Sequence, residues 1–167
     1  MIIVSYGIHR WKRSVPISKW TSKVLNATTR VSACHQPPCV GISLFLCPTI
    51  YSEDYLYLNI FIPLLSDSSS TSRLSVMIFI AGGVLGFLAT GTKPNDIKSN
   101  YDLLNQRLAI AWIKANIDAF GGDSKQITLF GQSAGAQPVA LHHITSEMQS
   151  FFQANIVQSA PMAIPFR

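Results

Sequence analysis

One ten-residue stretch constrains the fold of this chain more than any other. Residues 127–136 read Ile-Thr-Leu-Phe-Gly-Gln-Ser-Ala-Gly-Ala, a short apolar strand that runs straight into a Gly-x-Ser-x-Gly turn opening a helix. A turn this sharp holds its central residue in a strained backbone conformation, so small residues must stand two positions away on either side. Gly131 and Gly135 meet that demand. We therefore expect a strand-turn-helix unit with Ser133 at its tip.

This placement favours one kind of chemistry at Ser133. The hydroxyl lies at the N-terminus of a helix, where the first backbone N–H groups have no partner within the helix and the helix dipole is positive. Such a site can hold a negatively charged oxygen, which is what acyl transfer to a serine requires. The motif therefore makes Ser133 a candidate nucleophile.

The composition allows one packed domain. The chain has 167 residues, of which 48% are hydrophobic and only 13% charged, so a sizeable core is possible and global disorder is excluded. The net charge is +5, and the excess is N-terminal, because no acidic residue precedes Glu53. Six cations precede it: Arg10, Lys12, Arg13, Lys19, Lys23 and Arg30.

A basic arm that also carries Trp11 and Trp20 raises the question of a nucleic-acid or anionic-membrane partner. The cations are spread along the segment rather than clustered, which is more typical of a solvated surface. We therefore expect no nucleic-acid partner. The oligomeric state is left open by the sequence.

The three cysteines, Cys34, Cys39 and Cys47, lie in one short stretch, and their odd number leaves at least one unpaired within the chain. Their pairing is left open. A zinc site needs a fourth ligand, and only His35 is near. Because the spacing is irregular and contains no C-x-x-C, we expect neither a metal nor a cofactor.

Two signals disagree about the secretory pathway. The apolar start, residues 1–6, is too short for the hydrophobic region of a signal peptide before charges begin at Arg10. Yet Asn26-Ala27-Thr28 is an N-glycosylation sequon, which matters only in a secretory protein. Asn26 is therefore a glycosylation candidate.

The remaining pattern alternates strands and helices. Expected strands cover residues 55–62 (ended by Pro63), 76–80, 126–130 and 154–157; expected helices cover residues 101–120 (stopped by Gly121-Gly122) and the segment from the turn to about 144. This order predicts an α/β fold, a mostly parallel sheet with flanking helices. Residues 74–89 are apolar enough for an alternative, a membrane span, but their glycines favour a buried strand followed by a loop, so no stable membrane span is expected.

Six motifs then occur in the order found in one known family. They are residues 52–60 (SEDYLYLNI), 76–83 (VMIFIAGG), 86–91 (GFLATG), 100–109 (NYDLLNQRLA), 120–123 (FGGD) and 131–136 (GQSAGA). Together they resemble the type-B carboxylesterases, the cholinesterase-like branch of the α/β-hydrolases. The resemblance covers nearly the whole chain but only the N-terminal third or so of a family member, so residues 1–167 look like part of such a domain.

The resemblance implies a site and a reaction. Ser133 would be the nucleophile, and the backbone amides of Gly82, Gly83 and Ala134 would form the oxyanion hole. The substrate would be a small carboxylic ester, cleaved through an acyl-enzyme that water then hydrolyses. By the same likeness the protein would be secreted or travel the secretory pathway, although no signal peptide is visible.

The chain also departs from the family in ways that affect activity. In this fold the triad acid and histidine follow the serine at a distance, but the sequence ends at Arg167, thirty-four residues past Ser133. His142 and His143 lie nine and ten residues along the helix that starts at the turn, roughly 13 to 15 Å from the serine at about 1.5 Å per residue. At that distance neither can be the general base of Ser133, His142 is read as a helix-face residue, and the chain by itself is expected to be an inactive fragment.

A second departure is internal. Gly83-Val84-Leu85 passes directly into Gly86, where the family has on the order of thirty further residues, about one supersecondary unit. We therefore expect an internal deletion near 84. The lost unit would contain a strand that lies between its neighbours in the sheet, so residues 76–80 could still pair with the strand before the turn but would leave an open edge on the other side.

Three single positions also differ. The resemblance implies a histidine at Ala81, a glutamate at Gln132 and a cysteine at Tyr55, and the last change leaves Cys34 without the disulfide partner that the resemblance implies. Because of these losses an alternative stays open, a non-catalytic cholinesterase-like interaction or adhesion domain. The retained Ser133 favours the esterase interpretation, since an adhesion module has no use for a nucleophile. Leu108 and Trp112 are expected in the core.

Overall fold

The computed structural model describes residues 3–4, 12–16, 27–28, 31–36, 50–64, 72–82, 90–92, 97 and 100–160. The chain divides into two compact units, Met1–Asn59 and Ile60–Arg167, and each is described by itself. Several predicted features lie outside the described residues: the glycosylation candidate Asn26, the oxyanion-hole candidate Gly83, the deletion near 84, and Cys39 and Cys47.

The first unit contains little regular structure among its described residues. Strand β1 (Ile3–Val4) pairs antiparallel with β2 (Val15–Pro16), and a single parallel bridge joins Ala33 to Tyr51. Cys34, beside this bridge, is a free cysteine.

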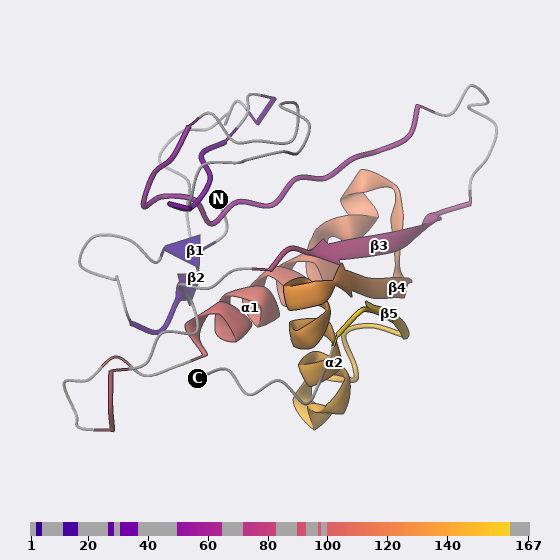
Figure 1. The fold of residues 1–167 in the computed structure, drawn as a ribbon. Helices are drawn as coiled ribbons and strands as arrows, with labels where there is room; N and C mark the ends of the chain where they lie inside the picture. Colours follow the sequence, from indigo (N-terminus) through magenta and orange to yellow (C-terminus); the bar gives the residue numbers. More distant parts are fainter. Residues whose placement is uncertain are drawn as a thin grey trace. The chain divides into compact units, whose positions relative to one another are not determined.

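The second unit is built on a parallel sheet of three strands in the order β3-β4-β5 (Figure 1). Its strands are β3 (Leu74–Ile80), β4 (Gly122–Gln132) and β5 (Ala154–Gln158). Its helices are α1 (Tyr101–Asn116), α2 (Ala136–Ile144) and the 3-10 turns η4 (Ile117–Phe120), η5 (Ser133–Gly135) and η6 (Ser146–Met148). The predicted α/β class is confirmed, as is the pairing of β3 with the strand before the Ser133 turn.

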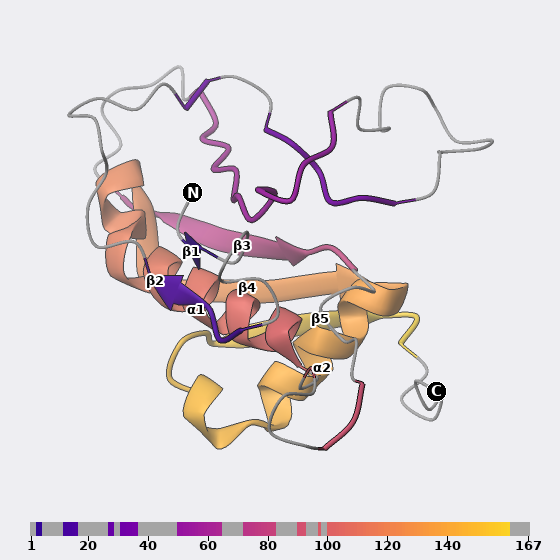
Figure 2. The same cartoon turned by 90° about the vertical axis from the view of Figure 1, so that its left-hand side faces the viewer.

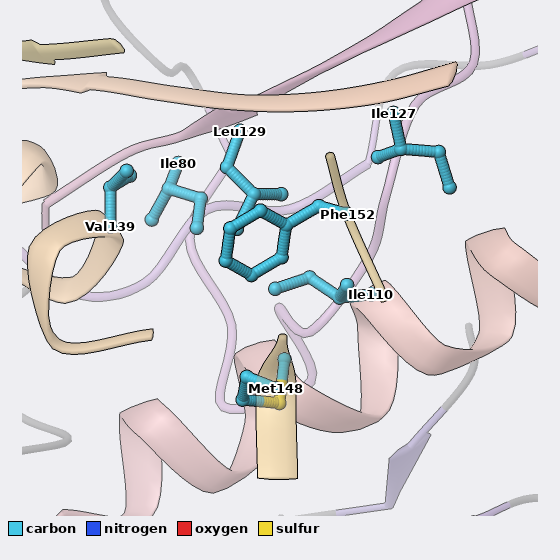
Figure 3. Packing of buried hydrophobic residues seen from close by; sticks show 7 residues of the cluster. All are labelled: Ile80, Ile110, Ile127, Leu129, Val139, Met148 and Phe152. Carbon is cyan, nitrogen blue, oxygen red and sulfur yellow. The ribbon is translucent and has the colours of Figure 1, made fainter. Parts of the chain in front are cut away.

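The core lies on one face of this sheet. Side chains from the strands meet side chains from α1, α2 and the segment around η6, and Figure 3 shows them converging between the sheet and the helices. The cluster consists of Ile80, Ile110, Ile127, Leu129, Val139, Met148 and Phe152. Leu108 and Trp112, predicted as core, are only half-buried; on α1 the buried residues are Asn105, Ile110 and Ile113.

The opposite face of the sheet carries apolar side chains that the described residues of this unit leave exposed. Met77 and Phe79 are each 59% exposed, and the Phe79 ring stands 5.1 Å from that of Phe130, its register partner on β4. Ile156, the partner of Phe130 on β5, is 44% exposed. Figure 2 shows α1 and α2 on the same side of the three strands. Strands of parallel sheets are normally buried on both faces, so this sheet is half-covered.

The strand predicted over residues 55–62 is wrong. The described segment 54–64 has no helix or strand, and within it Phe61 is 89% exposed and Leu64 fully exposed. A strand is stable only when its backbone groups find a neighbouring strand. In the described part of the chain, β3 pairs on one side with β4 and has no strand on the other. Residues 55–62 have a composition that favours a strand but, among the residues that the structure describes, no strand with which to pair.

The alternative of a membrane span over residues 74–89 has no support from the fold. Leu74–Ile80 is a strand, and in the part of the chain that the structure describes no helix combines the length and apolar character needed to cross a bilayer.

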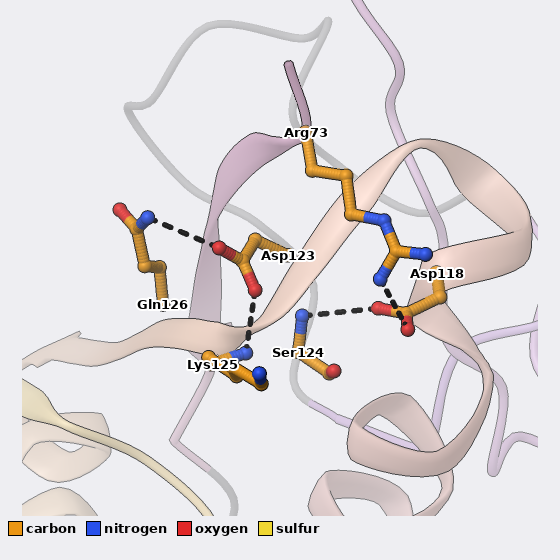
Figure 4. A network of polar contacts seen from close by, with 6 residues as sticks. All are labelled: Arg73, Asp118, Asp123, Ser124, Lys125 and Gln126. Carbon is orange, nitrogen blue, oxygen red and sulfur yellow. Dashed lines mark hydrogen bonds and ion pairs between the residues drawn. The ribbon is translucent and has the colours of Figure 1, made fainter. Parts of the chain in front are cut away.

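A polar network fixes the connection from α1 to β4 (Figure 4). Arg73, just before β3, forms an ion pair of 2.5 Å with Asp118 in η4, and the Ser124 N–H donates to the same carboxylate at 3.1 Å. This N–H and the Ser124 side chain are the main causes that lower the pKa of Asp118. Asp123 in turn accepts from the Lys125 N–H at 2.8 Å. Through Asp118, the network links the residue before β3 and the third residue of β4 to η4.

Candidate active site

The turn at Ser133 has the strained geometry that its sequence predicts. Gln132 ends β4 in an extended conformation, with φ −124° and ψ 143°, and Ser133 then adopts φ 52°, in the left-handed region. The chain returns at once to helical geometry, because the Ala136 N–H bonds to the Ser133 carbonyl. The Ser133 side chain is exposed. A serine rarely adopts positive φ, and such strain persists only where the surroundings enforce it.

The two flanking glycines make this turn possible, because without a Cβ atom they let neighbouring backbone segments approach closely. A Cβ atom on Gly131 would lie 2.5 Å from the carbonyl oxygen of Gly135, and one on Gly135 would lie 2.2 Å from the carbonyl oxygen of Ile80. Both contacts are with backbone, which cannot move aside as a flexible side chain can. Any larger residue at either position would force β4, the turn and the end of β3 apart.

The turn also touches the loop that leaves β3. A Cβ atom on Gly82 would lie 2.7 Å from the Ala134 Cβ and 3.1 Å from the Gly135 nitrogen. Two of the three residues predicted for the oxyanion hole, Gly82 and Ala134, are therefore neighbours in space although 52 positions apart in sequence. The third, Gly83, lies outside the described residues. The close approach depends on the parallel pairing of β3 with β4, which brings Ile80 opposite Gly131.

The two histidines after the turn have partners on other elements. His143 is exposed, and its Nδ1 lies 2.8 Å from Asn155 Nδ2 on β5. His142 is 2% exposed, and its Nε2 lies 3.0 Å from Gln106 Oε1 on α1. Burial, together with the nearby Arg107 charge, lowers the pKa of His142 to about 4. His142 is therefore a neutral interior residue near pH 7.

His142 lies on the buried face of α2, whereas its interpretation as a helix-face residue left open which face it occupies. The signal was present in the sequence, because His142 follows the buried Pro138 and Val139 at positions i+4 and i+3, which places all three on one face of α2. Within the described ranges, no three His, Cys, Asp or Glu side chains gather in a group that could hold a metal ion.

Comparison with known proteins relates this chain to one family. A sequence profile described as "Carboxylesterase family" matches residues 4–85 and residues 83–167. A cholinesterase of Mus musculus is 32% identical over 199 aligned residues, which cover 96% of this chain and 32% of that protein. Acetylcholinesterases of Danio rerio and Bungarus fasciatus are each 31% identical, with 96% of this chain covered in both and 31% and 32% of the relative, respectively. The chain thus spans about a third of the length of these relatives.

The alignments also bear on the continuity of the chain. The family profile matches in two segments that meet at residues 83–85. The alignment to the mouse protein runs over 199 residues whereas the chain has 167, so at least 32 aligned positions carry no residue of this chain.

Proposed function

Because the chain belongs to the carboxylesterase family, we propose that it is part of a carboxylic ester hydrolase in which Ser133 is the nucleophile. The observation that carries the proposal is the exposed Ser133 at φ 52°. It stands between two glycines whose Cβ positions are filled by backbone. Strain of this kind on a serine at the end of a parallel strand is expected where the hydroxyl must be presented to a substrate.

The proposed reaction uses the turn and the loop after β3 together. Ser133 Oγ attacks the ester carbonyl carbon, and the negative charge that develops on the carbonyl oxygen is held by the backbone N–H groups of Ala134, Gly82 and Gly83. Collapse of this intermediate expels the alcohol and leaves an acyl-enzyme, which water hydrolyses. The proximity of Gly82 to Ala134 and Gly135 supports the proposal, because two residues that would donate these N–H groups are neighbours in space.

We propose in addition that residues 1–167 alone do not turn over substrate. Attack needs a base that removes the Ser133 proton, and the candidates after the turn are unsuitable: His142 is buried against Gln106, and His143 is paired with Asn155. Loss of a triad member commonly lowers the rate by several orders of magnitude. The two-segment match around residue 84 supports an internal deletion, and the loss of the unit after Gly83 would also displace part of the oxyanion hole.

Two measurements on the purified chain test this function. We expect hydrolysis of a short p-nitrophenyl ester to be no faster than with Ser133→Ala, because neither His142 nor His143 is placed to take the Ser133 proton. We expect a serine-directed fluorophosphonate, supplied in excess over hours, to label the chain at Ser133 and to leave Ser133→Ala unlabelled. Serine-dependent turnover would contradict the inactivity of the chain, and equal labelling of both proteins would contradict the nucleophile.

The alternative, a non-catalytic interaction domain of the cholinesterase-like kind, is favoured by one observation. Positions 81 and 132 carry Ala and Gln, where the family resemblance implies His and Glu. The labelling experiment separates the two functions, since an interaction domain has no reason to keep a reactive serine presented.

For the protein in a cell we propose the secretory pathway, with Asn26 as a glycan acceptor, because the sequon at residues 26–28 is useful only there. Expression behind a secretion signal should give a protein whose mass falls after treatment with an N-glycosidase. Asn26→Gln should remove that difference.

A further inference from the structure

Hydrogen bonds join three polar side chains of α1 and α2 in series. Gln106 Nε2 donates to Asp102 Oδ2 at 2.9 Å, and Gln106 Oε1 lies 3.0 Å from His142 Nε2. His142 is 2% exposed, whereas Asp102 and Gln106 are half-buried. These hydrogen bonds therefore link α1 to α2 through the single side-chain amide of Gln106.

The direction of these hydrogen bonds follows from the chemistry of the groups. An ionised carboxylate only accepts, so the Gln106 nitrogen must face Asp102 and its carbonyl oxygen must face His142. His142 Nε2 therefore carries the proton and donates it to Gln106. The orientation of the Gln106 amide fixes the tautomer of His142.

The surroundings of this ring favour its uncharged form. Arg107 on α1 contributes a like charge, and the carboxylate of Glu147 in η6 is already paired with Arg107. Asp102 reaches the ring only through the Gln106 amide. His143, next along α2, faces Asn155. A second proton on His142 would thus create a buried cation with no carboxylate in contact with it among these groups.

The helix that His142 holds is the one that carries the Ser133 turn. η5 (Ser133–Gly135) runs directly into α2, and the strained turn persists only while α2 stays packed. We propose that Gln106 and His142 are positioning residues that clamp the helix of the Ser133 turn to α1, and that a second proton, on Nδ1, weakens the clamp: the Nε2–H bond to Gln106 would remain, but the buried ring would become a cation. The link to the reactive serine rests on the function proposed above, but the clamp itself is testable without any reaction.

The sign of the pH dependence follows from the His142 pKa. In the unfolded chain the ring titrates at its ordinary value, 6.5, and in the fold at about 4. The folded state therefore binds fewer protons, so the stability that His142 contributes is present above pH 6.5 and is lost as the pH falls toward 4. Burial raises the pKa of Asp102, which acts in the opposite direction, because protonation of that carboxyl favours the fold. The pH dependence of stability must therefore be compared between the parent chain and a variant that lacks His142, so that the effect of His142 is separated from that of Asp102.

The test compares the full 167-residue chain with two matched variants, His142→Gln and His143→Gln. Glutamine can donate to Gln106 from nearly the same place as His142 Nε2, but it does not titrate. Urea unfolding measures the unfolding constant of each protein at pH 7.5 and at pH 4.5. The rise in this constant on acidification should be on the order of tens of fold larger for the parent chain than for His142→Gln. His143→Gln, changed at an exposed neighbour, should behave as the parent.

A second measurement reports on the turn itself. Hydrogen exchange of a peptide spanning residues 133–144, corrected for intrinsic rates, should increase on acidification in the parent and in His143→Gln but not in His142→Gln. Equal acid sensitivity of the parent and His142→Gln would overturn the clamp.

If His142→Gln does not fold, NMR titration of the histidine rings in the parent decides. A His142 ring that titrates at or above 6.5 would overturn the proposal, and one that titrates near 4 would support it. None of these outcomes depends on ester hydrolysis or labelling. The clamp can therefore be contradicted while the proposed function stands, and the proposed function can be contradicted while the clamp stands.

Discussion

At the scale of single residues, the most informative observation is a backbone angle. Ser133 is one of three non-glycine residues with positive φ in the described part of the chain, together with Asn100 and Ser159. Strain at a serine that is exposed, and flanked by glycines in backbone contact, is retained for a purpose other than stability.

The strain at Ser133 predicts an unusual order of stabilities. Ser133→Gly should be more stable than Ser133→Ala by about 1 kcal/mol, because only glycine adopts positive φ without steric cost. Thermal or urea unfolding measures the difference. Ala119→Gly, at an exposed position without positive φ, is the control and should destabilise the chain. If Ser133→Ala were the more stable variant, the turn would not be strained.

The glycines around the turn give a second prediction. Gly135→Ala should lower the free energy of unfolding by more than about 3 kcal/mol, because its Cβ would lie 2.2 Å from the Ile80 carbonyl oxygen. Gly121→Ala should cost only about 1 kcal/mol, since φ there is 81° but nothing lies within 4 Å of the added atom. Equal losses in urea unfolding would show that the contact with Ile80 does not set the requirement for glycine.

At the scale of elements, β3 has two unlike faces. Ile80 points into the core and is 6% exposed, whereas its neighbour Phe79 points to the uncovered face and is 59% exposed. The losses of stability caused by truncating Ile80 and Phe79 to alanine therefore compare how well the two faces of the sheet are covered.

Ile80→Ala should lower the free energy of unfolding by about 2 to 5 kcal/mol, through lost burial and the cavity left behind. Phe79→Ala should cost about 1 kcal/mol, chiefly the ring contact with Phe130. Chemical denaturation of both variants tests this ranking. A larger loss at Phe79 would mean that this face is covered in solution.

At the scale of the whole molecule, the described residues leave the sheet uncovered on one face and without a strand neighbour at one edge. The core draws its helical side chains from one side only, and β3 has a strand neighbour on one side only within the described residues. An α/β fold normally closes both faces with helices. The chain spans about a third of the length of the relatives that it matches.

Local pattern was sufficient to predict most elements of the second unit. The strand at Leu74–Ile80, the helix that begins at Tyr101, the strand before the turn and the helix after it were all predictable, because hydrophobic period and glycine stops act within a few residues. The strained turn at Ser133 was predictable for the same reason, since its steric demand falls on residues two positions away.

Two features were decided only by tertiary structure. Residues 55–62 have the composition of a strand but form none, because a strand depends on a neighbour that local sequence does not supply. The pKa of His142 is lowered by burial and, next, by the charge of Arg107, which lies on a helix some thirty-five residues earlier in the chain. The sequence by itself thus determined the turn that presents Ser133, whose causes are local. The packing of distant segments decided which strands pair and which side chains are buried, because both depend on partners far along the chain.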